Sequence, residues 1–95
     1  MINILADVAI EDFDKFIGAF STRGFDARKA HGSIGSQVFK IAGEENRVIV
    51  LFEWESLAAF EGFLSNPKVK ETMKSSGTTR PPVFTYLEKA AEFQG

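Results

Sequence analysis

The sequence predicts an α+β fold of the ferredoxin-like type, in which a four-stranded antiparallel sheet carries helices on one face only. Two observations predict it. Strand-like and helix-like segments follow one another in the order β-α-β-β-α-β, a weak internal repeat of two β-α-β halves. A continuous apolar stretch at 48–52 also leads directly into an amphipathic helix, and the chain opens with a similar strand and helix. With 95 residues, of which 44% are hydrophobic, the chain suffices for one domain, which we place at 1–95.

Hydrophobic periodicity predicts the first strand and helix. Residues 2–10 place apolar side chains at every second position, which is the period of a strand. Residues 11–22 carry four apolar side chains at the spacing i, i+3, i+4, i+7, with acidic residues in the first turn, where the helix dipole favours them. Gly24 is a natural end for this helix. Residues 25–35 contain two glycines and are predicted as a loop with no more than one helical turn.

A hairpin is predicted at the centre of the chain. Residues 36–42 are expected to form the second strand, 43–46 the turn, and 48–52 the third strand. A strand with one face in water should alternate between apolar and polar side chains, yet the third strand is apolar without interruption. We therefore expect both faces of this strand to be buried.

The second half of the chain contains two helix starts. Ser56 is a good N-cap for an amphipathic helix, and Asn66 followed by Pro67 begins another helical segment that Gly77 ends. Residues 78–82 are predicted as a loop and 83–87 as the fourth strand. Residues 88–95 form a short tail, either frayed or packed on a partner.

The predicted sheet has one face that no helix of the same chain covers. The third strand is apolar on both sides, and the neighbouring strands add Phe39 and either Phe84 or Tyr86. An open apolar face of this size is rare in monomers. We therefore expect a second copy to cover it, sheet on sheet, as a homodimer with two-fold symmetry.

Composition excludes several classes of protein. The chain has no cysteine, which excludes disulfides and thiolate metal sites, and its single histidine offers no metal site. The net charge is −2 without a basic patch, so nucleic acid is not expected as a partner. We also expect no signal peptide and no membrane span, and hence a cytoplasmic location.

A stretch in the second half resembles a known superfamily. Trp54-Glu55-Ser56, followed by Phe60, Phe63-Leu64 and Ser65-Asn66-Pro67, is similar to the dimeric α+β barrel proteins, and most of all to the antibiotic-biosynthesis-monooxygenase-like members. The resemblance implies ferredoxin-like subunits whose sheets pair into a barrel. Members of the superfamily include cofactor-independent oxygenases acting on aromatic polyketides, haem-degrading enzymes and small isomerases.

The haem-degrading branch fits poorly. The resemblance places its catalytic Trp at Phe63 and its iron-ligating His at Met73, and only Asn3 matches the Asn expected in the first strand. Two of the three functional residues are therefore missing. We expect neither haem degradation nor any other bound cofactor or metal.

Three single residues are candidates for a functional site. His31 is a candidate general base because its unperturbed pKa lies near neutrality, although a turn or surface role is the alternative. Trp54 ends the buried strand and either packs in the core or turns its indole N–H to a ligand. Asn3, Asp7 and Glu53 are polar residues on apolar strands, and one of them is a candidate to line the cavity, with a wet strand end as the alternative for Glu53.

The phenylalanines offer a second kind of site. They fill the core or, if the helices splay from the sheet, line an apolar pocket for a flat aromatic ligand. The binding residues that we predict are Asn3, Phe16, Phe20, Trp54, Phe60, Phe63 and Met73, with His31 as the catalytic candidate. Arg28, Lys29 and Arg80 either gather an anion or form a solvated basic rim, and the rim is the preferred interpretation.

Two functions remain open from the sequence. The first is binding or conversion of a small apolar or aromatic molecule, with a cofactor-independent monooxygenase or an isomerase as the expected enzyme. The second is a non-enzymatic dimeric module whose aromatic residues are all structural. An RNA-binding domain and a ligand-sensing regulatory domain share the same element order, but the acidic balance disfavours the former and the absence of an attached enzyme the latter.

Overall fold

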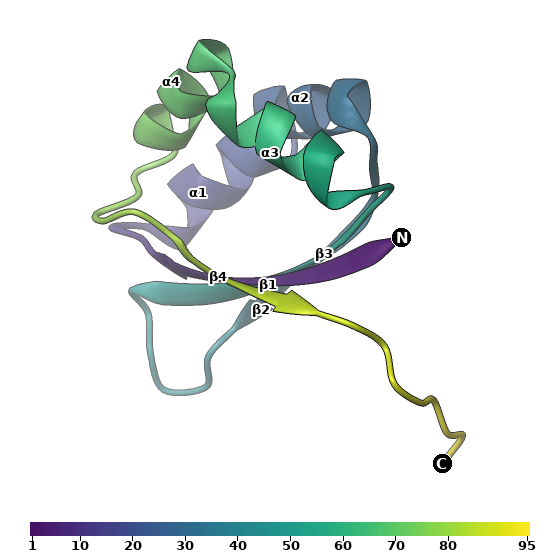
Figure 1. The fold of residues 1–95 in the computed structure, drawn as a ribbon. Coiled ribbons are helices and arrows are strands. Elements are labelled where there is room, and N and C mark those ends of the chain that lie inside the picture. Colours follow the sequence, from purple (N-terminus) through teal and green to yellow (C-terminus); the bar gives the residue numbers. More distant parts are fainter.

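The computed structural model describes residues 1–95 as one four-stranded sheet with all helices on one side (Figure 1). The elements in chain order are β1 (Ile2–Ala9), α1 (Phe13–Phe20), α2 (Arg23–His31), β2 (Ser33–Lys40), β3 (Arg47–Trp54), α3 (Leu57–Ser65), α4 (Pro67–Ser75) and β4 (Val83–Leu87). The strands lie in the order β2-β3-β1-β4, and every neighbouring pair is antiparallel. This confirms the ferredoxin-like α+β fold. Two short helices follow β1, and two short helices follow β3.

The helical segment between β1 and β2 departs from the prediction. Residues 25–31, predicted as a loop, belong to α2, and Gly24 lies inside this helix and does not end α1. The sequence does not indicate this helix, because it has no apolar stripe and its one buried side chain is that of Arg28. The glycine that ends a helix here is Gly32, whose φ of 107° places it in the left-handed region. The second strand consequently begins at Ser33, three residues earlier than predicted.

The helix starts are positioned by side-chain caps. The Ser56 hydroxyl accepts a hydrogen bond from the Ala59 N–H at 3.1 Å, as the sequence predicted. Asn66 accepts from the Lys68 N–H at 2.9 Å, with Pro67 in the first turn. These caps fix where α3 and α4 leave the sheet and so determine how the two helices lie over it.

The core lies between the sheet and the helices. Alternate residues of β1 and β3 point to this side, and the register pairs Ile4 with Phe52, Ala6 with Val50 and Val8 with Val48. These six side chains are buried, and Phe16, Phe60, Phe63 and Val69 from three of the helices pack on them. The inner face of the sheet is therefore the floor of any site between the layers.

The opposite, outer face of the sheet is mixed. On β3, Ile49 and Leu51 are partly exposed between the charged ends Arg47 and Glu53. The prediction that both faces of β3 are buried thus holds only for the helix side within one chain. Phe39 lies on the outer face and is 50% exposed, whereas Phe84 and Tyr86 belong to the inner face.

No helix in the structure is both long enough and apolar enough to cross a bilayer. The last eight residues, 88–95, extend from β4 without regular structure (Figure 1).

Candidate functional site

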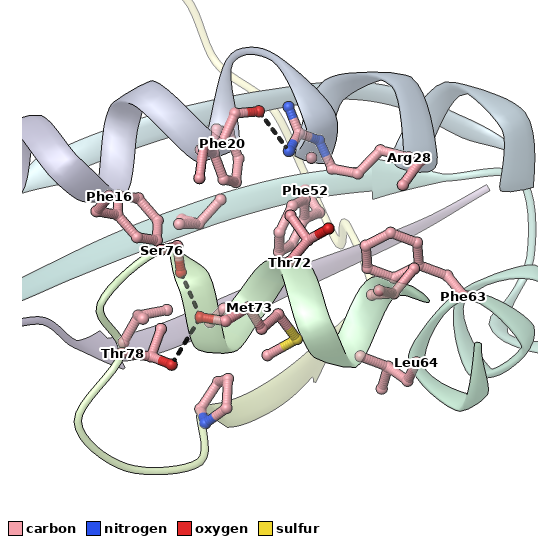
Figure 2. Close-up of a pocket in the computed structure, with 18 of the residues that line it drawn as sticks. Phe16, Phe20, Arg28, Phe52, Phe63, Leu64, Thr72, Met73, Ser76 and Thr78 are labelled. Atoms are coloured by element: carbon pink, nitrogen blue, oxygen red, sulfur yellow. Dashed lines mark hydrogen bonds between the residues drawn. The ribbon is translucent and has the colours of Figure 1, made fainter. Parts of the chain in front are cut away.

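A small apolar pocket of about 80 Å³ lies between the inner face of the sheet and the helices (Figure 2). Twenty residues line it, and fourteen of them are hydrophobic. The floor comes from β1, β3 and β4, and the walls come from all four helices. Such a lining favours a ligand that is mainly hydrocarbon.

Phenylalanine rings form a continuous aromatic wall. Adjacent centroids are 5.4 Å apart between Phe16 and Phe20, 6.2 Å between Phe20 and Phe52, and 6.1 Å between Phe52 and Phe60. Phe63 follows at 6.2 Å from Phe60. Aromatic rings at these separations attract one another.

Five of the predicted binding residues meet at this pocket. Phe16, Phe20, Phe60, Phe63 and Met73 all line it, and Figure 2 shows Met73 reaching in from α4. They come from α1, α3 and α4. The sequence therefore predicted which faces of these three helices line the pocket, but it predicted no pocket residue on α2.

Trp54 and Asn3 lie outside the pocket lining. Trp54 is fully buried behind Phe60 and Phe63, with centroid separations of 5.2 and 5.0 Å. Its indole Nε1 has no hydrogen-bond partner. Asn3 lies on the outer face of the sheet, as do Asp7 and Glu53. These residues occupy the alternate strand positions whose side chains point away from the helices. None of these three polar residues reaches the pocket between the layers.

His31 is also outside the pocket lining. It is the last residue of α2, and its Nε2 lies 3.2 Å from the Asn66 Nδ2. The Asn66 Oδ1 already accepts from the Lys68 N–H, so the amide turns its NH₂ group toward the imidazole. We therefore assign the neutral tautomer with the proton on Nδ1, in which Nε2 accepts. In this position His31 ties α2 to the start of α4.

Arg28 is the lining residue that sequence reasoning missed. It was interpreted as part of a solvated rim, but only 6% of it is exposed, and burial lowers its pKa to about 10. Its Nη1 donates to the Phe20 carbonyl at 3.0 Å, and its guanidinium lies 3.6 Å from the centroid of the Phe20 ring. Nothing in the sequence marks this burial; in the structure, a Cβ added at Gly24, one turn earlier, would approach both the Ala19 carbonyl oxygen and Nη1 to 3.1 Å.

The other polar groups of the lining are hydroxyls that serve the backbone. Ser76 and Thr78 both donate to the Met73 carbonyl, and Thr72 donates to the Lys68 carbonyl. No aspartate, glutamate or histidine lines the pocket. Nowhere in the structure do three His, Asp or Glu side chains gather in a way that would hold a metal ion.

Comparison with known proteins gives one family. The family model described as antibiotic biosynthesis monooxygenase matches residues 1–75. A search of curated proteins found no match.

Solved structures of low sequence identity share the fold. SnoaB, a cofactor-independent oxygenase from Streptomyces nogalater, is 10% identical with a TM-score of 0.79, over 99% of this chain and 97% of SnoaB. An antibiotic biosynthesis monooxygenase from Caulobacter crescentus is 18% identical with a TM-score of 0.76, over 95% of this chain and 90% of that protein. One from Deinococcus radiodurans is 16% identical with a TM-score of 0.65, over 100% of both chains.

Proposed function

Because the chain belongs to the antibiotic biosynthesis monooxygenase family, we propose that its pocket binds a small, mainly apolar molecule and oxygenates it without a cofactor. The observation that carries this proposal is the aromatic wall around a pocket whose lining is largely hydrophobic. The family and the likeness of fold to SnoaB support the oxygenation.

Pocket size limits the ligand. A cavity of about 150 Å³ holds one benzene molecule, and the present pocket measures about 80 Å³. With the helices in this arrangement, the pocket accommodates part of a single ring or a short chain. A whole aromatic ring, such as that of toluene, therefore enters only if α3 and α4 move slightly away from the sheet.

The proposed reaction depends mainly on the redox chemistry and acidity of the substrate. Without a cofactor, the substrate itself supplies the electrons, as in R₂CH₂ + O₂ → R₂C=O + H₂O. The substrate must first lose a proton, and no carboxylate or imidazole lines the pocket to take it. The suitable substrates are therefore acidic phenols or enols that ionise readily by themselves.

A second candidate function is binding without a reaction. The absence of any His, Asp or Glu from the lining favours it, because these are the usual general acids and bases. The same pocket would then serve a non-enzymatic module that holds a small apolar molecule.

One pair of variants tests both candidates. Ala27 lines the pocket from α2, so Ala27→Leu should fill it, whereas Ala30→Leu on the same helix is exposed and serves as the matched control. We expect toluene to shift the NMR signals of Val50 and Phe52 in the wild type and in A30L but not in A27L. Wild-type protein should also consume oxygen with an acidic phenol and place one atom of ¹⁸O₂ in the product.

The outcomes separate the two functions. If the protein binds toluene but consumes no oxygen with any of a panel of phenols and enols, the result would contradict the oxygenase and support binding without a reaction. Equal toluene shifts in A27L and the wild type, or no shifts in either, would contradict the pocket as the site.

We also propose that two copies associate through the outer face of the sheet. The support is the apolar centre of that face, where partly exposed Leu5, Ile49 and Leu51 adjoin the exposed Phe39, while the exposed Val83 lies on β4 beyond Asp7. Burying the exposed parts of these side chains favours association, because a large apolar side chain gains roughly 1.5–3 kcal/mol when it passes from full exposure to full burial. Light scattering at micromolar concentration should give twice the mass of the chain.

A further inference from the structure

The charge on Arg28 has no negative partner. The side chain is nine-tenths buried, and no carboxylate lies within ion-pair distance of it. A guanidinium has five N–H donors, and the structure uses one of them, from Nη1 to the Phe20 carbonyl. A buried cation without a counter-ion is costly, so its presence in the wall of a pocket requires an explanation.

A capping role accounts for only part of this arrangement. Phe20 is the last residue of α1, and a cation beside its carbonyl is favourable because it faces the negative end of the helix dipole. That role needs one donor, and a partly exposed lysine or arginine would fulfil it without the cost of burial. Arg28 lines the pocket, and its Nε and Nη2 have no hydrogen-bond partner but are not fully buried, so they remain accessible to a ligand.

The guanidinium is held in a fixed plane. It stacks on the Phe20 ring on one side, and the missing side chain of Gly24 leaves room for Nη1. Figure 2 shows the side chain running back along α2 to Phe20. Donors held in place before a ligand arrives bind it at a lower entropic cost.

Nothing else in the lining competes for an anion or repels it. The lining has no acidic residue, and the hydroxyls of Thr72, Ser76 and Thr78 give their protons to backbone carbonyls. An apolar surrounding also strengthens a charge-assisted hydrogen bond relative to water.

We propose that Arg28 binds a negatively charged oxygen of the ligand, so that the pocket selects small apolar molecules bearing one carboxylate, phenolate or enolate. This inference rests on the proposed function, since it assigns the ligand class of the same pocket. In an oxygenase, Arg28 would stabilise the ionised form of the substrate, and the pocket would then need no general base.

Benzoate and benzamide provide a matched pair of probes. They have almost the same size and shape but differ in charge. In NMR titrations at neutral pH we expect the wild type to bind benzoate more tightly by on the order of 10- to 100-fold, which is the range for a charge-assisted hydrogen bond in a buried site. This preference is measured on the wild type and does not depend on any variant folding.

Variants assign the preference to Arg28. Arg28→Met keeps the length of the apolar stem and should bind benzoate no more tightly than benzamide. Lys29→Met is the matched control, since it removes one charge from an exposed position on the same helix and should retain the preference.

A coloured phenol separates the two kinds of anion. Binding of 4-nitrophenol to the wild type should shift its absorbance toward that of the phenolate, and the shift should be absent in R28M. A benzoate preference without this shift would restrict the site to carboxylates.

Two results would overturn the inference. If the wild type binds benzamide and benzoate equally, the pocket stands but Arg28 is only a cap for α1. If the wild type binds neither these probes nor toluene, the proposed function itself fails and this inference fails with it.

Discussion

At the scale of single residues, Asp7 shows how the outer face tolerates charge. Its carboxylate accepts two hydrogen bonds from Arg47, at 2.9 Å from Nε and 2.8 Å from Nη2, and Arg80 lies 4.0 Å away. The hydrogen bonds from Arg47 hold the pKa of Asp7 below its ordinary value, and the charges of Arg47 and Arg80 add to this against partial desolvation. The pair is partly exposed, so its contribution to stability is modest.

This pair predicts a pH dependence of stability. A carboxyl group whose pKa is lower in the folded state stabilises the fold above its unfolded pKa, and this contribution disappears as pH falls through the folded value. We expect wild type to be more stable than Asp7→Asn at neutral pH, with the difference vanishing below the ordinary aspartate range. Urea unfolding from pH 7 to pH 2 measures both curves, and parallel curves would contradict the assignment.

Side-chain environments were only partly predictable from the sequence. The phenylalanines of the pocket follow from helical spacing, because a ring on an apolar stripe must face the core. The burial of Arg28 does not follow from the sequence, because arginine is rarely buried and its contacts with Phe20 depend on how α2 packs against α1. His31 and Asn66 are 35 residues apart, and their contact depends on tertiary packing.

At the scale of elements, Asn66 joins three helices. Its backbone N–H bonds to the Phe63 carbonyl at the end of α3, its Oδ1 caps α4, and its Nδ2 donates to His31 at the end of α2. Ser56, by contrast, caps α3 alone. Two N-caps of the same chain therefore differ in how much else they hold.

This difference predicts unequal costs of substitution. Ser56→Ala should lower the free energy of unfolding by about 1 kcal/mol, the usual cost of a lost N-cap. Asn66→Ala should cost about 1 kcal/mol more, because it also removes the hydrogen bond to His31. Denaturant unfolding of both variants checks this, and His31→Phe supplies a control in which the cap remains. Equal losses for S56A and N66A would show that the contact with His31 contributes nothing.

Element boundaries were predictable where local chemistry marks them. The Ser56 and Asn66-Pro67 starts and the fourth strand Val83–Leu87 agree with the structure. The second helix was missed because neither an apolar stripe nor a side-chain cap marks it. Its helical state depends on tertiary packing instead, since α2 contacts α1, α3, α4 and β2 and contributes Ala27 and Arg28 to the pocket.

At the scale of the whole molecule, the mixed outer face supports the proposed pairing. Leu51 lies in the middle of it, opposite Leu5 on β1 and Gln37 on β2. The charged pair Asp7–Arg47 lies toward one end of the strands. An apolar centre with a polar rim is the usual anatomy of an interface between subunits.

A charge at this centre should separate the copies. We expect Leu51→Lys to halve the mass measured by light scattering at micromolar concentration, because two like charges would face each other in the buried centre. Glu61→Lys, on the exposed side of α3, changes the charge without touching the outer face and should leave the mass unchanged. A wild-type mass equal to one chain would contradict the pairing outright.

The strand order has a consequence for folding during translation. β1 is synthesised first, yet its partners β3 and β4 follow only after α1, α2 and β2. On a ribosome that adds roughly 5–20 residues per second, the apolar side of β1 waits about 2–9 s for β3 to be completed. During that interval the apolar side of the nascent strand can associate with other chains, so slowing translation within β2 should increase the demand for chaperones.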